Sequence, residues 1–286
     1  MNVDERNGLR VYRFATVPAE LVDALVSTRM GGTSAGRYRS LNLGLRVEDD
    51  PEAVVHNRRR LFASYDLPLE RSAWCRQVHR DTVTVVDEHV LGPAGQRGAF
   101  SEDDVIPDTD ALVTNLPGVP LCVTLADCVP VVIYDRSRHV LALAHAGWGG
   151  TVARIASSTV RVMAERYGSV PGELIAAIGP SIGPEHYEVG RDVVSAARAA
   201  FGERIERAFT MRADGRAQFD LWSANVIDLT DAGLPGASID VAAISTAGAL
   251  DEFYSHRAEP PVTGRMVAVA MLHRSPDLSS PGRLRR

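Results

Sequence analysis

Eight short apolar runs constrain the fold of this 286-residue chain more than any other feature of its sequence. Each run is five to eight residues long, rich in valine, isoleucine, leucine and alanine, and bounded by turn-forming residues, which is typical of buried β-strands. The runs cover residues 21–28, 82–86, 119–125, 130–134, 140–145, 174–178, 239–245 and 266–272. Because several follow one another without a helix between them, the sequence predicts mixed β-sheets rather than strict alternation of strands and helices.

Four longer segments are expected to be helices that flank these sheets. They cover residues 51–66, 150–167, 191–201 and 221–232, with Asp50 and Pro51 suited to open the first and Gly168 to close the second. No linker divides the strands into two sets. We therefore expect an α+β fold, with mixed β-sheets layered with flanking helices, in a single domain over residues 1–273. Residues 88–108 are expected to form a long loop, and the Pro-, Ser- and Arg-rich tail 274–286 is expected to be disordered.

Composition narrows the classes of partner and compartment. The net charge of −5 argues against a nucleic-acid partner, and no apolar run of about 18 residues exists to span a membrane. The charged start lacks the apolar segment of a signal peptide, and three cysteines are too few for a disulfide framework. A small-molecule substrate and a cytoplasmic location are therefore expected, whereas the oligomeric state stays open.

The chain contains no lysine, since all 31 of its Lys and Arg residues are arginine. This excludes Schiff-base chemistry, pyridoxal-phosphate catalysis, Ser-Lys nucleophiles and the P-loop lysine. An anion in the site must therefore be bound by arginine, by a helix N-terminus or by a metal ion.

Three residues that commonly bind metals are expected to lie beside turns. His79 and Cys128 stand near turns that adjoin predicted strands, and His145 ends a predicted strand directly before a glycine-rich turn. Two imidazoles and one thiolate would leave the fourth tetrahedral position of Zn²⁺ open, as in catalytic zinc sites, where the ion activates water as a nucleophile. From the residues alone, a structural histidine and a core cysteine are the more usual interpretations, and spacing does not help because the three positions are far apart in the chain.

The same segments resemble the motifs of the laccase-domain family, bacterial proteins also called polyphenol oxidases or peptidoglycan editing factors, to which purine nucleoside phosphorylase activity is assigned. The likeness runs from about residue 22 to 270. The matching motifs are STRMGGTS (27–34), SLNLG (40–44), DDP (49–51), NR (57–58), QVH (77–79), TDALVT (109–114), ADC (126–128), HAGW (145–148), IGPSI (178–182), YEVG (187–190), FYSHR (253–257) and TGR (263–265).

The resemblance implies a zinc site formed by His79, Cys128 and His145. It also implies phosphorolysis of adenosine, inosine and methylthioadenosine, deamination of adenosine, and sheets flanked by helices. Two positions depart from the family pattern: Gly149 stands where the family usually has arginine, and Ser245-Thr246 replaces a usual Cys-Thr. Neither change removes an expected metal ligand, but the first removes a candidate contact to an anion.

Several further residues receive candidate roles from their places in these motifs. Arg29, Arg58 and Arg257 are candidates to bind phosphate, although each is also suited to a structural ion pair. Asn42 could bind a ribose hydroxyl or a purine edge, or it could cap a turn. Asp127, beside Cys128, could accept a proton or hold a metal-binding histidine in place.

Alternative activities remain open from the sequence. A hydrolase that edits peptidoglycan precursors could use Cys128 as the nucleophile and His145 as the base. A binding protein that kept the fold and lost activity is a third hypothesis, prompted by Gly149 and Ser245. One Cu²⁺ could occupy the His2Cys set and support a polyphenol oxidase side activity. A four-copper laccase is excluded, because the eight histidines include no His-x-His pair.

Overall fold

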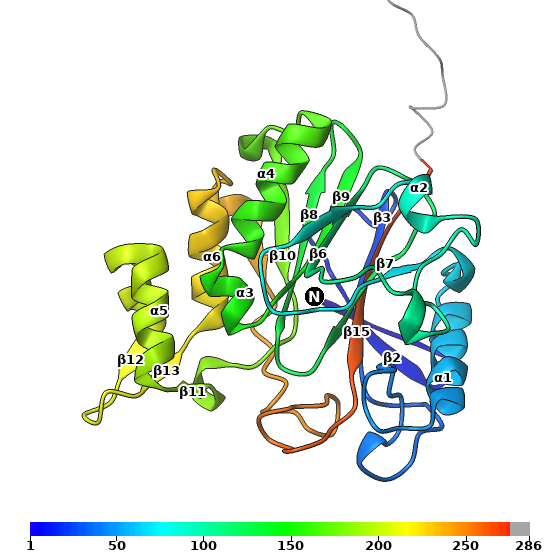
Figure 1. Cartoon of the computed structure of the whole chain (residues 1–286), viewed down its shortest axis with the longest axis horizontal. Coiled ribbons are helices and arrows are strands. Elements are labelled where there is room, and N and C mark those ends of the chain that lie inside the picture. Colours follow the sequence, from blue (N-terminus) through cyan, green and yellow to red (C-terminus); the bar gives the residue numbers. More distant parts are fainter. Residues whose placement is uncertain (275–286) are drawn as a thin grey trace, which may run out of the picture.

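Two six-stranded β-sheets form the centre of the molecule in a computed structural model that describes residues 1–274 (Figure 1). The first sheet has the order β1 (Asn2–Arg6), β2 (Leu9–Arg13), β3 (Val22–Ser27), β15 (Met266–Leu272), β7 (Leu121–Leu125), β4 (Ala73–Trp74). The second has the order β14 (Ile239–Val241), β10 (Ile175–Ile178), β8 (Val129–Asp135), β9 (Val140–Ala146), β6 (Ala111–Thr114), β5 (Val83–Val85). A small third sheet contains β11 (Glu188–Val189), β13 (Ala217–Phe219) and β12 (Phe209–Met211).

Helices cover the outer faces of both large sheets (Figure 1). The α-helices are α1 (Pro51–Ser64), α2 (Glu88–Leu91), α3 (Trp148–Val152), α4 (Ile155–Tyr167), α5 (Arg191–Phe201) and α6 (Leu221–Asp231). Short 3-10 helices span Gly36–Tyr38, Leu69–Arg71, Glu102–Asp104, Pro171–Glu173, Pro184–His186, Gly202–Ala208 and Gly236–Ser238. The strands β8 and β9 share one apolar cluster with α4, α5 and α6, whereas β3 and β15 share another with α1.

The central strands are apolar throughout because both of their faces are buried. In β8, Val131 and Ile133 pack toward the helices, whereas Val132 and Tyr134 lie in the cluster between the two sheets. In β15, Ala268 lies between the sheets and Val267 packs toward α1. The alternation of side chains along a strand thus fills three apolar layers. This explains why the sequence shows continuous apolar runs rather than alternating polar ones.

The structure confirms the expected α+β class and has a strand or helix in each segment that the sequence predicted, although the strand expected at 239–245 ends at Val241. One helix differs, because the segment predicted at 150–167 is divided into α3 and α4 by Arg154, whose φ of 66° is left-handed. The expected loop at 88–108 contains α2 and a 3-10 turn. The expected tail lies, apart from Arg274, outside the described residues, and the boundary at residue 273 stays a prediction. No helix among the described residues has the length and apolar character needed to cross a membrane.

The chain passes between the two sheets in two loops that matter for function. One loop joins β4 of the first sheet to β5 of the second and carries His79, and the other joins β7 to β8 and carries Cys128. His145 lies near the end of β9, where Pro130 at the start of β8 is its register partner. All three residues therefore lie at the same end of the two packed sheets.

Candidate active site

His79, Cys128 and His145 come together as the sequence predicts. One ligand atom from each, two imidazole nitrogens and the Cys128 sulfur, all lie within 4.8 Å of one another. The two imidazole rings have centroids 4.9 Å apart and meet at 72°. His145 is buried, Cys128 is half-buried and His79 is exposed, so one side of the group faces solvent. A pair of histidines with one cysteine at this separation is a donor set that fits a divalent metal ion.

A buried carboxylate fixes two of these residues. Oδ1 of Asp110 lies 3.0 Å from Nδ1 of His145 and also accepts a hydrogen bond of 3.0 Å from the backbone N–H of His79. Its Oδ2 accepts hydrogen bonds from the backbone N–H groups of Val78 and Arg80. With Nδ1 of His145 held by Asp110, Nε2 is the nitrogen left to act as a ligand. Such carboxylate partners orient metal-binding histidines.

Close packing behind the site requires glycine at position 147. A Cβ atom there would lie 2.8 Å from Sγ of Cys128 and 2.8 Å from Nδ1 of His79. These separations are shorter than van der Waals contact, so a side chain would displace both groups. Gly147 therefore allows the turn after β9 to pass directly beside the side chains of Cys128 and His79.

Cys128 and His145 shift each other's ionisation in the absence of a metal ion. Burial would raise the pKa of the Cys128 thiol, but the adjacent imidazoles of His145 and His79 lower it to about 6. Burial would lower the pKa of His145, but the Cys128 thiolate and the Asp110 carboxylate raise it to about 9. The sulfur is thus prepared to be a thiolate at neutral pH, which is the form that binds metals.

The three residues open into a cavity of about 1020 Å³. This volume is at the upper end of the range of about 300–1,000 Å³ that is typical of small-molecule sites. Aromatic and polar side chains from separate segments of the chain line it, among them Gln77, Trp148, Tyr187 and His256. Glu102 from the 88–108 segment also lines the cavity, as do several arginines. The cavity therefore offers planar surfaces together with hydrogen-bonding and charged groups.

Asp127 lies in the cavity wall, but it does not contact a candidate metal ligand through its carboxylate. The carboxylate accepts hydrogen bonds from Oγ1 of Thr246 (2.7 Å), Oγ of Ser255 (3.0 Å) and the backbone N–H of Arg257 (2.7 Å). The carboxylate that holds a histidine is that of Asp110. Asp127 thus ties the strand-end loop to the 255–257 segment, and its role as proton acceptor stays a prediction.

The arginines predicted to bind substrate occupy different environments. Arg257 lines the cavity, packs over the Tyr187 ring at 4.8 Å and donates one hydrogen bond to the carbonyl of Glu188. Arg58 is almost fully buried, lies 3.7 Å from the Trp74 ring centroid and donates to the carbonyls of Leu43, Gly98 and Ala99. Arg58 borders the cavity with its guanidinium committed to the framework, so Arg257 is the better placed to meet a ligand.

Arg29 and Asn42 are not among the residues that line the cavity. Arg29 pairs with Glu259 at 3.0 Å and packs over the ring of Tyr254. Asn42 is fully buried and bonds Asp49 through its amide N–H, while its amide oxygen accepts the backbone N–H of Arg265. The structure therefore gives both residues contacts within the framework, which is the alternative that the sequence left open for each.

The sequence interpretation assigned no role to three residues that the structure brings to the site. Asp110 and Gln77 appear in the quoted motifs but received no function, and Arg80 follows directly after His79. Besides its motif, the sequence signal for Asp110 is its place at the start of an apolar run that forms β6. A buried carboxylate at a strand end commonly has a specific partner.

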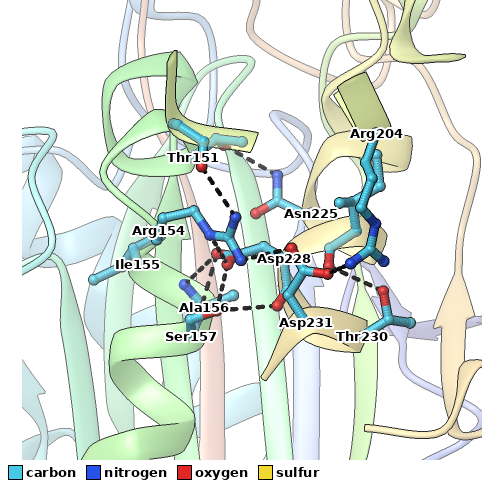
Figure 2. Close-up of polar contacts among 12 residues, drawn as sticks. Thr151, Arg154, Ile155, Ala156, Ser157, Arg204, Asn225, Asp228, Thr230 and Asp231 are labelled. Carbon is cyan, nitrogen blue, oxygen red and sulfur yellow. Dashed lines mark hydrogen bonds and ion pairs between the residues drawn. The ribbon is translucent and has the colours of Figure 1, made fainter. Parts of the chain in front are cut away.

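A polar network fixes α3, which follows His145 and carries the cavity residue Trp148 (Figure 2). The buried carboxylate of Asp228 on α6 accepts from Nε of Arg154 at 2.7 Å and from the backbone N–H of Ala156 at the start of α4. Asn225 of α6 donates to Oγ1 of Thr151 on α3. The left-handed Arg154 thus ends α3 where α6 can hold both helices.

Comparisons with known proteins agree with this architecture. The family model described as multi-copper polyphenol oxidoreductase laccase matches residues 23–273. A purine nucleoside phosphorylase of Deinococcus radiodurans is 40% identical over 249 residues, covering 87% of this chain and 88% of the relative. Adenosine deaminase RL5, from an unknown prokaryotic organism, is 36% identical over 220 residues, covering 77% and 82%. The crystal structure of YlmD from Geobacillus stearothermophilus has a TM-score of 0.89 at 35% identity, covering 95% of this chain and 98% of that one.

Proposed function

Because the chain belongs to the multi-copper polyphenol oxidoreductase laccase family, we propose that it is a zinc-dependent purine nucleoside phosphorylase that also deaminates adenosine. The single observation that carries this proposal is the convergence of His79, Cys128 and His145 at the cavity. The names of the relatives, which include purine nucleoside phosphorylase and adenosine deaminase, support the reaction types. Adenosine, inosine and methylthioadenosine are the proposed nucleosides, and the cytoplasm is the proposed compartment.

The chain's own residues would divide the work as follows. His79, Cys128 and His145 would hold Zn²⁺, which supplies Lewis acidity when bound. Trp148 and Tyr187 offer flat surfaces to a purine. The Arg257 guanidinium donates one hydrogen bond to the protein, so its other N–H groups are free to bind an anion. Asp127, which borders the cavity beside Cys128, is the candidate to accept or return a proton. Because the chain has no lysine, arginine is the side chain available to neutralise the phosphate beside the metal ion.

The test combines elemental analysis of the purified protein with an inosine assay. We expect about one zinc per chain and release of hypoxanthine that requires phosphate. His79→Ala and Cys128→Ala should lose both the metal and the activity, whereas Arg136→Gln, in the turn between β8 and β9, should retain both. Phosphorolysis that continues in a metal-free variant would reject the proposal. One copper in place of zinc, with oxidation of phenols, would favour the polyphenol oxidase activity instead.

One observation also fits a cysteine nucleophile. The thiol of Cys128, with a pKa of about 6, lies against His145, which is the arrangement that a Cys–His hydrolase needs. In that case the chain would release an amino acid from a peptidoglycan precursor. Chelators distinguish the two functions, because they would abolish a zinc-dependent phosphorylase and leave a thiol hydrolase active.

A further inference from the structure

The cavity at the candidate active site is lined by several arginines that have no part in binding the proposed metal ion. Five arginines line the cavity, namely Arg46, Arg58, Arg80, Arg257 and Arg265. Among the acidic residues, Glu102 and Asp127 line it, and Asp127 already accepts three hydrogen bonds from the protein. The surplus of positive charge indicates that the cavity receives an anion.

Four of these guanidinium groups already have partners in the protein. Arg58 donates to three backbone carbonyls, and Arg265 donates to those of Thr263 and Gly264. Arg257 donates to a carbonyl, and Arg46 pairs with Glu102 at 3.7 Å. Across residues 1–274, Arg80 is the cavity arginine whose guanidinium makes neither a hydrogen bond nor an ion pair. All five of its N–H donors are thus free for a ligand.

The backbone of Arg80 is fixed although its side chain is not. Its N–H donates to Oδ2 of Asp110 at 3.0 Å, and the same carboxylate holds His79 and His145. The Asp110 carboxylate therefore fixes the backbone of Arg80 as well as two candidate metal ligands. A guanidinium from this position can reach an anion beside the metal centre at little cost in backbone ordering.

Helix α3 packs closely on the backbone of His79 and Arg80. At Gly149 a Cβ would lie 2.8 Å from the carbonyl oxygen of His79, and at Gly150 it would lie 3.4 Å from that of Arg80. The two glycines thus let the start of α3 pack directly on the 79–80 backbone. A larger residue at 149 would displace this segment, so α3 contributes close packing rather than a side chain here.

We propose that Arg80 binds the orthophosphate co-substrate next to the His79–Cys128–His145 centre. This assignment rests on the proposed phosphorylase function and names the side chain that recognises its anionic reactant. Arginine suits the task because its planar group donates paired hydrogen bonds to phosphate oxygens. Lysine would offer a point charge without this geometry.

The test is the KM for orthophosphate at saturating inosine, measured for the zinc-loaded wild type, Arg80→Gln, Arg80→Lys and Arg136→Gln. Loss of charge-assisted hydrogen bonds should raise this KM about tenfold or more in Arg80→Gln. Arg80→Lys should recover part of the loss. Arg136 is the matched control, an exposed arginine that is not among the cavity residues and should keep the wild-type KM. Zinc content is measured alongside to follow the neighbouring centre.

The outcomes separate this assignment from the proposed function. Wild-type phosphorolysis with an unchanged phosphate KM in Arg80→Gln overturns the assignment and leaves the function in place. A wild type that never consumes phosphate overturns both. If Arg80→Gln loses zinc and Arg80→Lys does too, Arg80 acts on the metal centre and the assignment is wrong.

Discussion

The carboxylate of Asp110 lies 3.0 Å from Nδ1 of His145, and the same Oδ1 accepts the backbone N–H of His79. One buried side chain therefore orients two candidate metal ligands that are 66 positions apart in the chain. Histidine ligands held in this way lose little freedom when a metal binds. The site is thus organised before the metal arrives.

Replacing Asp110 with alanine is expected to lower zinc affinity about 10- to 100-fold, because His145 loses its orienting partner and the 78–80 backbone loses its acceptor. Competition with a chromophoric chelator measures the change. Asp110→Asn should lose less, since an amide oxygen can still accept one of the hydrogen bonds. An alanine variant with wild-type affinity would show that the contact is dispensable.

The Gly147→Ala variant is expected to fold and to bind zinc poorly. The added methyl would press against Sγ of Cys128 and Nδ1 of His79, so the two ligands must separate. Metal stoichiometry and circular dichroism measure the two effects. Gly172→Ala is the control, because a Cβ at residue 172 meets nothing within 4 Å. Equal zinc content in both variants would contradict the packing argument.

The network in Figure 2 should carry much of the stability of the α3–α4–α6 corner. Removing the Asp228 carboxylate leaves Nε of Arg154 and the backbone N–H of Ala156 without their acceptor, whereas Arg154 keeps its ion pair with Asp231. We expect Asp228→Ala to reduce the free energy of unfolding by about 1–3 kcal/mol, because buried N–H donors lose their acceptor. Urea denaturation measures this loss.

The control for Asp228→Ala is the exposed pair between Arg161 and Glu165 on α4. Glu165→Ala should change the free energy of unfolding by less than about 0.5 kcal/mol, because surface pairs of this spacing contribute little. Similar losses in the two variants would show that the buried network has no special weight.

Asp135 should make stability depend on acidic pH. Burial alone would raise the pKa of its carboxyl group, but the hydroxyl groups of Ser169 and Ser137 and the backbone N–H of Arg138 lower the pKa below the ordinary 3.8. The ionised form is therefore preferred in the folded protein. Its stabilisation is fully present above pH 3.8 and is lost as the pH falls through the lower folded-state value.

We accordingly expect Asp135→Asn to lower the free energy of unfolding at pH 7 by about 1–3 kcal/mol, the difference between charged and neutral acceptors. The gap between variant and wild type should shrink as the pH is taken below 3.8. Denaturation in urea across this range measures it. A gap that is independent of pH would assign the effect to packing instead.

Local patterns were sufficient for much of the fold. The apolar runs identified the buried strands, and Asp50 and Gly168 occupy the helix ends that their residue types indicate. The sequence prediction missed the first hairpin, although an Asn-Gly pair is a typical hairpin turn. Asn7 and Gly8 both adopt positive φ in the turn between β1 and β2. The strands on either side of this turn, at the edge of the sheet, contain many charged residues, so they lack the apolar run by which the other strands were predicted.

Long-range contacts explain the remaining differences. The helix break at Arg154 is held by Asp228, which lies 74 positions later. The local sequence around Arg154 therefore does not contain the residue that stabilises the break. The metal-ligand set followed from the family resemblance, since the spacing of His79, Cys128 and His145 has no local pattern. Whether an arginine meets a substrate or a carbonyl also depends on distant backbone, which is why Arg58 and Arg257 could not be distinguished beforehand.

The loops that carry His79 and Cys128 each lead from one large sheet to the other. An ion bound by both loops and by His145 would cross-link the two sheets at that end. Any shift of one sheet relative to the other would then separate the ligand atoms. Metal affinity would therefore depend on correct packing of the two sheets. A chain that had formed only one of its sheets would have no grip on the ion, and chemistry would begin only after folding was complete.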